Sequence, residues 1–239
     1  MSSTDARPLD EVWPQEKRDA LRAQALDERG SFYSPWVHLA VPSLFGCAAI
    51  AAAVSLLRAP TVVDLLFGIG LFIVSNAAEW RIHKSLLHKR QPFAALLYDR
   101  HTPMHHMVFV TDDMAIRKRD EFRLVLLPAY AVVVLAIGLS PMAWALWQLA
   151  GQHNLACVFV IETMGYVVTY EWLHLSYHLP PDSFIGRLGL VRFLRRHHAL
   201  HHDPRLMQKW NFNVSLPLWD LVKRTYVRTF AGESVPGQG

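Results

Sequence analysis

The sequence predicts an all-α integral membrane protein with four transmembrane helices in two hairpins and a cytosolic helical cap. Three observations support this fold class. Apolar residues make up 52% of the 239 residues, and charged residues only 18%. The apolar residues gather in stretches long enough to cross the hydrocarbon core of a bilayer, which takes about 20 residues. The basic residues collect on one predicted side of these stretches.

The composition divides the chain into three parts. Residues 1–35 are polar and expected to be cytosolic, residues 36–225 form the membrane domain, and residues 226–239 form a tail expected to be disordered. The formal net charge is only +4, and the basic residues border apolar spans. Because nucleic-acid binding needs a basic face on a soluble module, no nucleic-acid partner is expected.

The first two spans are expected at about 36–57 and 61–79. Arg58 and Pro60 interrupt the apolar pattern between them. Each span is long enough to cross the bilayer, and the connection is too short for a folded loop. The two spans should therefore form a helical hairpin.

The last two spans are expected at about 124–139 and 142–170, with the turn at Ser140-Pro141. A second possible turn is Gly151–Asn154, where polar residues again interrupt the apolar pattern. The nine-residue piece between the two turns is too short to cross alone. Either turn therefore gives two crossings.

The distribution of Lys and Arg predicts the orientation. Five precede the first span, nine lie between Arg81 and Arg123, and nine lie between Arg187 and Arg228. The two opposite loops share only Arg58. Because cytoplasmic loops carry an excess of Lys and Arg, both termini are expected in the cytoplasm, together with the histidines that follow the second and fourth spans.

Ten of the thirteen histidines fall into four short boxes, each next to an apolar stretch, whereas His38 and His153 are isolated near span ends and expected at the interface. Polar groups at membrane depth are costly and usually functional. Imidazole suits iron, zinc and copper, and ten imidazoles exceed what one ion can use, so two metals sharing the set is the simplest interpretation. The cap is expected to hold a histidine-ligated di-metal site with these ligands: His83, His88, His101, His105, His106, His174, His178, His198, His201 and His202.

Helical spacing places several of these rings on common faces. Residues four apart on an α-helix point the same way, as His174 and His178 should do. His83 and His88 are five apart, so they need a bent segment or metals lying between them and the other boxes. Two further sets are expected to share one face each: His101 with His105, and His198 with His201 and His202.

Other polar residues are candidates for supporting the ligands, because a metal-bound histidine usually donates its second N–H to a carboxylate or carbonyl. Glu79 and Glu171 precede two boxes by four and three residues, which lets a carboxylate approach a ligating ring. A helix-end carboxylate that faces lipid headgroups is the alternative. His197 could donate a hydrogen bond to the site or replace His198 as a ligand. The remaining candidates for supporting roles are Asp203, Asn211 and Asp220.

Four segments carry a resemblance to a known family. They are Glu79-Trp-Arg-Ile-His83-Lys-Ser-Leu-Leu-His88 with His101-Thr-Pro-Met-His105-His106, then His174-Leu-Ser-Tyr-His178 and His198-Ala-Leu-His201-His202. They resemble the boxes of the fatty acid hydroxylase/sterol desaturase superfamily. Asn211-Phe-Asn-Val-Ser-Leu-Pro-Leu-Trp219-Asp220 is similar to the stretch that follows them. The resemblance runs from about Trp36 to Thr225 and is closest to the fatty acid 2-hydroxylases.

This resemblance implies a membrane oxygenase that uses two iron ions and O₂, with the ten histidines as ligands and zinc able to replace iron in purified protein. It implies a lipid substrate from the bilayer and hydroxylation of a fatty acyl chain. The close alternatives are a sterol or acyl-lipid desaturase and a carotenoid hydroxylase; a membrane metal- or haem-binding protein is the non-enzymatic alternative. Electrons are expected from a separate cytochrome b5-like or ferredoxin-type donor, since 35 N-terminal residues cannot form a cytochrome domain.

Overall fold

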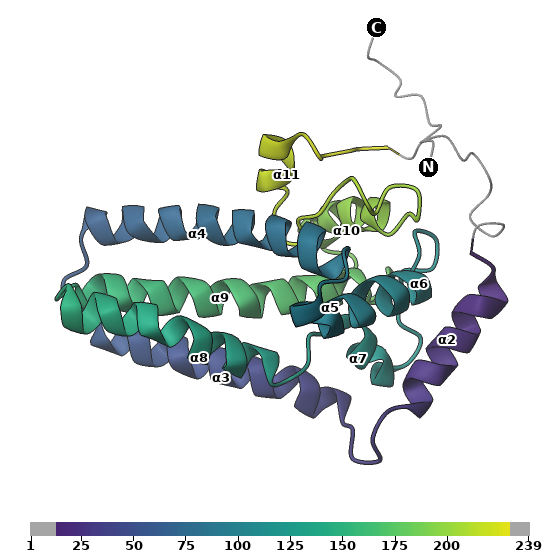
Figure 1. Ribbon diagram of the computed structural model, residues 1–239, viewed down its shortest axis with the longest axis horizontal. Coiled ribbons are helices and arrows are strands. Elements are labelled where there is room, and N and C mark those ends of the chain that lie inside the picture. Colours follow the sequence, from purple (N-terminus) through teal and green to yellow (C-terminus); the bar gives the residue numbers. More distant parts are fainter. Residues whose placement is uncertain (1–12, 230–239) are drawn as a thin grey trace, which may run out of the picture.

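The computed structural model describes residues 13–229, which are mostly helical and contain no β-strand (Figure 1). Four helices are long and apolar enough to cross a membrane. They are α3 (Pro35–Leu56), α4 (Val62–Ile82), α8 (Ala131–Trp144) and α9 (His153–Tyr177); α4 and α8 continue into π-helical turns at His83–Leu87 and Ala145–Leu149. The predictions for residues 1–12 and 230–239 lie outside the described residues.

The first two long helices begin where local chemistry favours a helix start. Ser34 caps α3 by accepting a hydrogen bond from the Val37 backbone N–H at 3.4 Å. At the start of α4 the Asp64 carboxylate accepts the Thr61 backbone N–H at 2.7 Å, one half of a capping box. These caps satisfy backbone groups that a helix end leaves unpaired. The observed starts lie within one residue of the predicted positions 36 and 61.

The third long helix differs from its predicted bounds of 124–139. It begins at Ala131 and runs through Ser140-Pro141 to Leu149, so the bounds predicted for the last two spans were wrong. Proline is tolerated inside membrane helices because neighbouring groups satisfy the freed carbonyl. The turn lies instead at Gly151, whose φ of 63° is left-handed and easily adopted only by glycine. The second of the two possible turns is therefore the one used.

Helix α9 is the centre of the bundle. It contacts α3, α4 and α8, and Figure 1 shows it between α4 and the α3–α8 pair. Gly46 of α3 lies so close to α9 that a side chain there would collide with Val168. Such small residues let membrane helices approach closely. The first two spans, predicted to pack as a hairpin, thus each make their main contacts with α9.

The outer faces of the long helices are exposed and apolar. Large hydrophobic side chains such as Leu65, Val134 and Ile137 are more than half exposed. Exposed apolar surface of this extent is unusual for a soluble protein and normal for one that contacts lipid. The four helices therefore indicate a membrane protein.

Shorter helices gather at one end of the bundle, together with α2 (Gln15–Asp27) (Figure 1). They are α5 (Ala95–Arg100), α6 (His106–Val108), α7 (Phe122–Val125), α10 (Gly189–His201) and α11 (Leu218–Lys223). A buried apolar cluster joins this end to the bundle, because Phe109 and Leu124 pack with Leu39 of α3 and Leu175 of α9. All ten box histidines lie at this end of the long helices.

A buried ion pair fastens α2 to this end of the bundle. The Arg22 guanidinium lies 2.6 Å from the Glu121 carboxylate, and the two side chains are 5% and 1% exposed. Glu121 also accepts the Arg117 backbone N–H at 3.0 Å, and Arg22 lies over the Phe109 ring. Because Phe109 belongs to the apolar cluster, this pair connects α2 to the core beside the histidines.

Glu121→Ala is expected to destabilise the protein by about 3 kcal/mol, because it removes the shorter of the two ion pairs of the buried Arg22 and leaves only Asp113, 3.6 Å away. Thermal unfolding of the detergent-solubilised chain would show this as a lower melting temperature. Asp120→Ala is the matched control: it breaks the neighbouring ion pair with Arg29, which is exposed and worth about 1 kcal/mol or less. Equal shifts for the two variants would contradict a structural role for the buried pair.

Candidate metal centre

The structure gathers the ten box histidines into two separate groups of five. In each group every residue offers one ring nitrogen, and these five nitrogens all lie within 4.8 Å of one another. All ten side chains are buried. Group one is His83, His88, His101, His106 and His201. Group two is His105, His174, His178, His198 and His202.

Two π-helical turns explain how residues five apart join group one. The π-helix closes i to i+5 hydrogen bonds, so residues five apart point the same way. The His88 N–H donates to the His83 carbonyl at 3.1 Å, and the next π-turn pairs His106 with the His101 carbonyl in the same manner. The bent segment expected between His83 and His88 is therefore a π-helical turn.

Ordinary α-helical spacing supplies most of group two. His174 and His178 end α9, and His198 and His202 lie four apart on α10 and its C-cap. Two of the predicted shared faces were wrong. The structure puts His101 and His105 in different groups, and it puts His201 in a different group from His198 and His202. The π-turn at residues 101–105 pairs His101 with His106 and turns His105 to the other group.

The ring nitrogens of each group face one another. Neighbouring Nε2 atoms are 2.9–3.0 Å apart in group one and 3.0–3.4 Å apart in group two. For His83 and His201, the Nδ1–H donates to a backbone carbonyl, so in the neutral ring each Nε2 carries a lone pair. Two lone pairs 3.0 Å apart repel unless a cation lies between them. The donor set therefore fits a metal ion in each group.

Five ligand histidines donate their Nδ1–H to backbone carbonyls. This second hydrogen bond fixes the tautomer and orientation of a metal-binding imidazole. The acceptors are backbone carbonyls of apolar and aromatic residues, so sequence reasoning missed them. The pairs are His83 to Phe212, His105 to Leu124 at 2.8 Å, His178 to Met114 at 2.7 Å, His201 to Trp210 at 2.8 Å and His202 to Phe109 at 2.6 Å.

Burial keeps these rings neutral. Loss of solvation, helped by neighbouring imidazoles, lowers the pKa of His88 to about 2 and that of His105 to about 3. The same causes hold the pKa of His201 and His202 well below the usual value. Because a metal binds the unprotonated ring, all four are ready to ligate at neutral pH.

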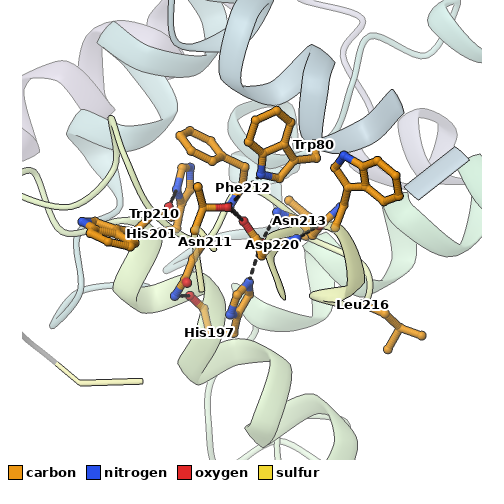
Figure 2. A network of polar contacts seen from close by, with 12 residues as sticks. Trp80, His197, His201, Trp210, Asn211, Phe212, Asn213, Leu216 and Asp220 are labelled. Atoms are coloured by element: carbon orange, nitrogen blue, oxygen red, sulfur yellow. Dashed lines mark hydrogen bonds and ion pairs between the residues drawn. The ribbon is translucent and has the colours of Figure 1, made fainter. Parts of the chain in front are cut away.

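The predicted supporting residues lie one layer further out than expected. Glu79 accepts hydrogen bonds from the backbone N–H groups of Val214 and Ser215, and Asp220 accepts those of Phe212 and Asn213 at 3.0 and 2.8 Å. Figure 2 shows Asp220 at the centre of this network. The carboxylates thus hold the loop of residues 210–220, and that loop's carbonyls hold His83 and His201.

Asn211 and His197 belong to the same loop network. The Asn211 backbone is left-handed, with φ of 56°, and its side-chain amide donates to the His197 carbonyl at 3.1 Å. The His197 ring lies 3.2 Å from the Asp220 carboxylate (Figure 2). His198, not His197, belongs to group two. His197 therefore supports the loop instead of replacing His198.

The other sequence candidates lie outside the two groups. Glu171 accepts the Leu127 backbone N–H at 3.2 Å, and Asp203 pairs with Arg205 at 2.6 Å. His38 bonds the Leu127 carbonyl at 2.8 Å, and His153 packs against the Trp147 ring. Among the described residues, none of these side chains hydrogen-bonds a ligand ring.

Comparison with known proteins identifies no relative: the chain matches no family model, and no curated protein or solved structure matches it. The interpretation of the site therefore depends on its own geometry, which shows two buried histidine groups that could hold metal ions.

His105→Ala and His106→Ala are expected to remove metal from different groups although the residues are adjacent. Each variant should lose about one of two ions per chain to a chelator that leaves the unmodified protein loaded, and the double variant should lose both. The reason is that losing a supporting group already lowers metal affinity about 10–100-fold, and losing a ligand should lower it further. Elemental analysis of purified protein measures this, with His153→Ala as the control. Loss of all metal from either single variant would show one shared site.

Proposed function

We propose that this chain is an O₂-dependent di-iron enzyme that oxidises a C–H bond in a membrane lipid, with hydroxylation of a fatty acyl chain as the favoured reaction. The observation that carries the proposal is the pair of buried five-histidine groups at the end of four membrane-length apolar helices. A lipid can approach such a site sideways without leaving the bilayer. The resemblance of the boxes to the fatty acid hydroxylase/sterol desaturase superfamily points to the same chemistry.

The ligand chemistry favours iron over zinc. Zinc sites in proteins are almost always four-coordinate, with three protein ligands and water in hydrolases, so five imidazoles per group are too many. Imidazole also binds iron well, and iron bound here would supply the O₂ activation that side chains lack. Zinc is expected to replace iron in protein purified without added iron, because it binds nitrogen ligands at least as tightly.

The protein's own residues prepare the site in three ways. Burial keeps the imidazoles neutral, backbone carbonyls fix the orientation of five of them, and the loop of residues 210–220 supplies two of those carbonyls, from Trp210 and Phe212. Burial also excludes bulk water, which would otherwise compete in side reactions. These features suit a reaction that must oxidise a strong C–H bond and not the solvent.

Electrons and protons complete the reaction. Hydroxylation consumes one C–H bond, O₂, two electrons and two protons, and yields an alcohol and water. Desaturation of an acyl chain or sterol breaks two C–H bonds, consumes the same O₂, two electrons and two protons, and yields a double bond and two waters. Carotenoid hydroxylation has the same balance as acyl-chain hydroxylation. The electrons would come from a separate cytochrome b5-like or ferredoxin-type protein at the cytoplasmic face, where the excess of Lys and Arg predicts the site and both termini.

A haem carrier fits the geometry less well. A haem held by two histidines needs room for a flat macrocycle between the facing rings. The rings of His105 and His174 are 4.8 Å apart between centroids, and those of His106 and His202 are 4.1 Å apart. The groups are compact enough for single ions and too compact for a porphyrin.

The test is untargeted lipid mass spectrometry on cells that express the intact chain with an electron donor, compared with cells that express His105→Ala. A lipid that gains one oxygen only with the intact chain is the expected result, because His105→Ala removes a ligand of group two. His153→Ala should behave as the intact chain.

A lipid that loses two hydrogens would move the assignment to a desaturase. An identical lipid profile for the intact chain and His105→Ala, in cells where the intact chain is metal-loaded and reduced by the donor, would contradict the proposal.

A further inference from the structure

A small cavity reaches both histidine groups. It has a volume of about 50 Å³ and is lined by His101 of group one and His105 of group two. The centroids of these two rings are 5.2 Å apart. A molecule in the cavity therefore lies against one histidine of each group at once.

The other walls of the cavity are apolar except for two arginines. Leu87, two leucines of α5 and residues 124–128 supply the apolar surface, and Arg100 and Arg123 supply the charge. The cavity borders the segment that leads into α8, and the nearby Leu96 and Tyr130 are about half exposed, at 51% and 57%. An apolar chain can thus leave the cavity toward lipid.

Within the described part of the chain, the two arginines have no carboxylate partner. Among residues 13–229, neither Arg100 nor Arg123 forms an ion pair, and Nη1 of Arg123 is buried without a hydrogen-bond acceptor. A buried donor left without an acceptor is costly. Both arginines line the same small cavity, beside the wall residue Leu127, whose carbonyl bonds the His38 ring.

We infer that this cavity, the arginine pocket, binds the anionic end of an acyl lipid through Arg100 and Arg123. The guanidinium fork matches a carboxylate or a phosphate, and the apolar walls match the adjoining methylenes. A cavity of 50 Å³ holds only a few water-sized groups. The charged end and the carbons beside it therefore fill it, and the rest of the chain runs into the membrane.

The inferred binding mode also limits where the substrate is oxidised, a consequence that rests on the proposed function. The arginines and the two histidines line the same small cavity. The oxidised carbon should consequently lie within a few bonds of the charged end, and not at mid-chain.

The test is photo-crosslinking in membranes that contain the metal-loaded full-length chain. The probe is a palmitate analogue with a photoreactive group near the carboxylate. Labelling is expected within residues 96–128 and should be displaced by palmitate, by hexadecyl phosphate or by both, but not by hexadecanol. The double variant Arg100→Gln/Arg123→Gln should label at least about tenfold less, since tenfold corresponds to only about 1.4 kcal/mol and the variant loses the charge-assisted hydrogen bonds of two guanidinium groups.

Three controls keep the result interpretable. Arg196→Gln removes an exposed arginine of α10 and should label normally. The single variant Arg100→Gln tests the exposed guanidinium alone. The single variant Arg123→Lys tests whether a positive charge without the guanidinium is enough. Unchanged metal content shows that each variant is folded. Displacement by only one of the two anions identifies which headgroup chemistry is bound.

Labelling that is unchanged in the double variant, or displaced equally by hexadecanol, would overturn the arginine pocket. Failure of the proposed function looks different, because the probe would then label in an arginine-dependent manner while no lipid is oxidised. Lipid oxidation with the same preference for anionic lipids in the double variant would instead reject the pocket and leave the proposed function standing.

Discussion

The burial of ten imidazole rings with their nitrogens facing one another is the constraint on which the rest of the structure depends. Burial removes the solvent that would otherwise satisfy these nitrogens and keeps the rings neutral. Neutral rings with a bonded Nδ1–H present only lone pairs to their neighbours, and two such lone pairs face each other at 3.0 Å between His83 and His201. A cation in each group relieves this repulsion, so metal binding and the stability of this end of the bundle should be coupled.

Two layers of hydrogen bonds around the rings meet this constraint. The rings are oriented by backbone carbonyls, and the carbonyls of Trp210 and Phe212 lie on a loop that Glu79 and Asp220 hold by its backbone N–H groups (Figure 2). No carboxylate of this layer pairs with a ligand ring among the described residues. Metal ions held by these neutral rings would therefore keep their positive charge available to an anionic or oxygen-derived ligand.

Much of this could be predicted from the sequence, and the remainder depends on features that leave no residue-type signal. The long apolar runs and the unusual density of histidine predicted four spans and the ten histidines that the structure gathers. The division into two groups could not be predicted, because π-turns and α-turns sort His101 from His105 although both occur in one box. The turn predicted at Ser140-Pro141 was wrong, because a proline can remain inside a membrane helix. The acceptor carbonyls were missed because every residue has one.

The central claim is that each group of five histidines holds its own metal ion. Anomalous diffraction from crystals of the metal-loaded protein, measured on both sides of the metal's absorption edge, tests it most directly. Two separate peaks per chain are expected, one among the Nε2 atoms of group one and one among those of group two. A single peak, or a peak whose ligands come from both groups, would contradict the division of the histidines and the two-metal chemistry built on it.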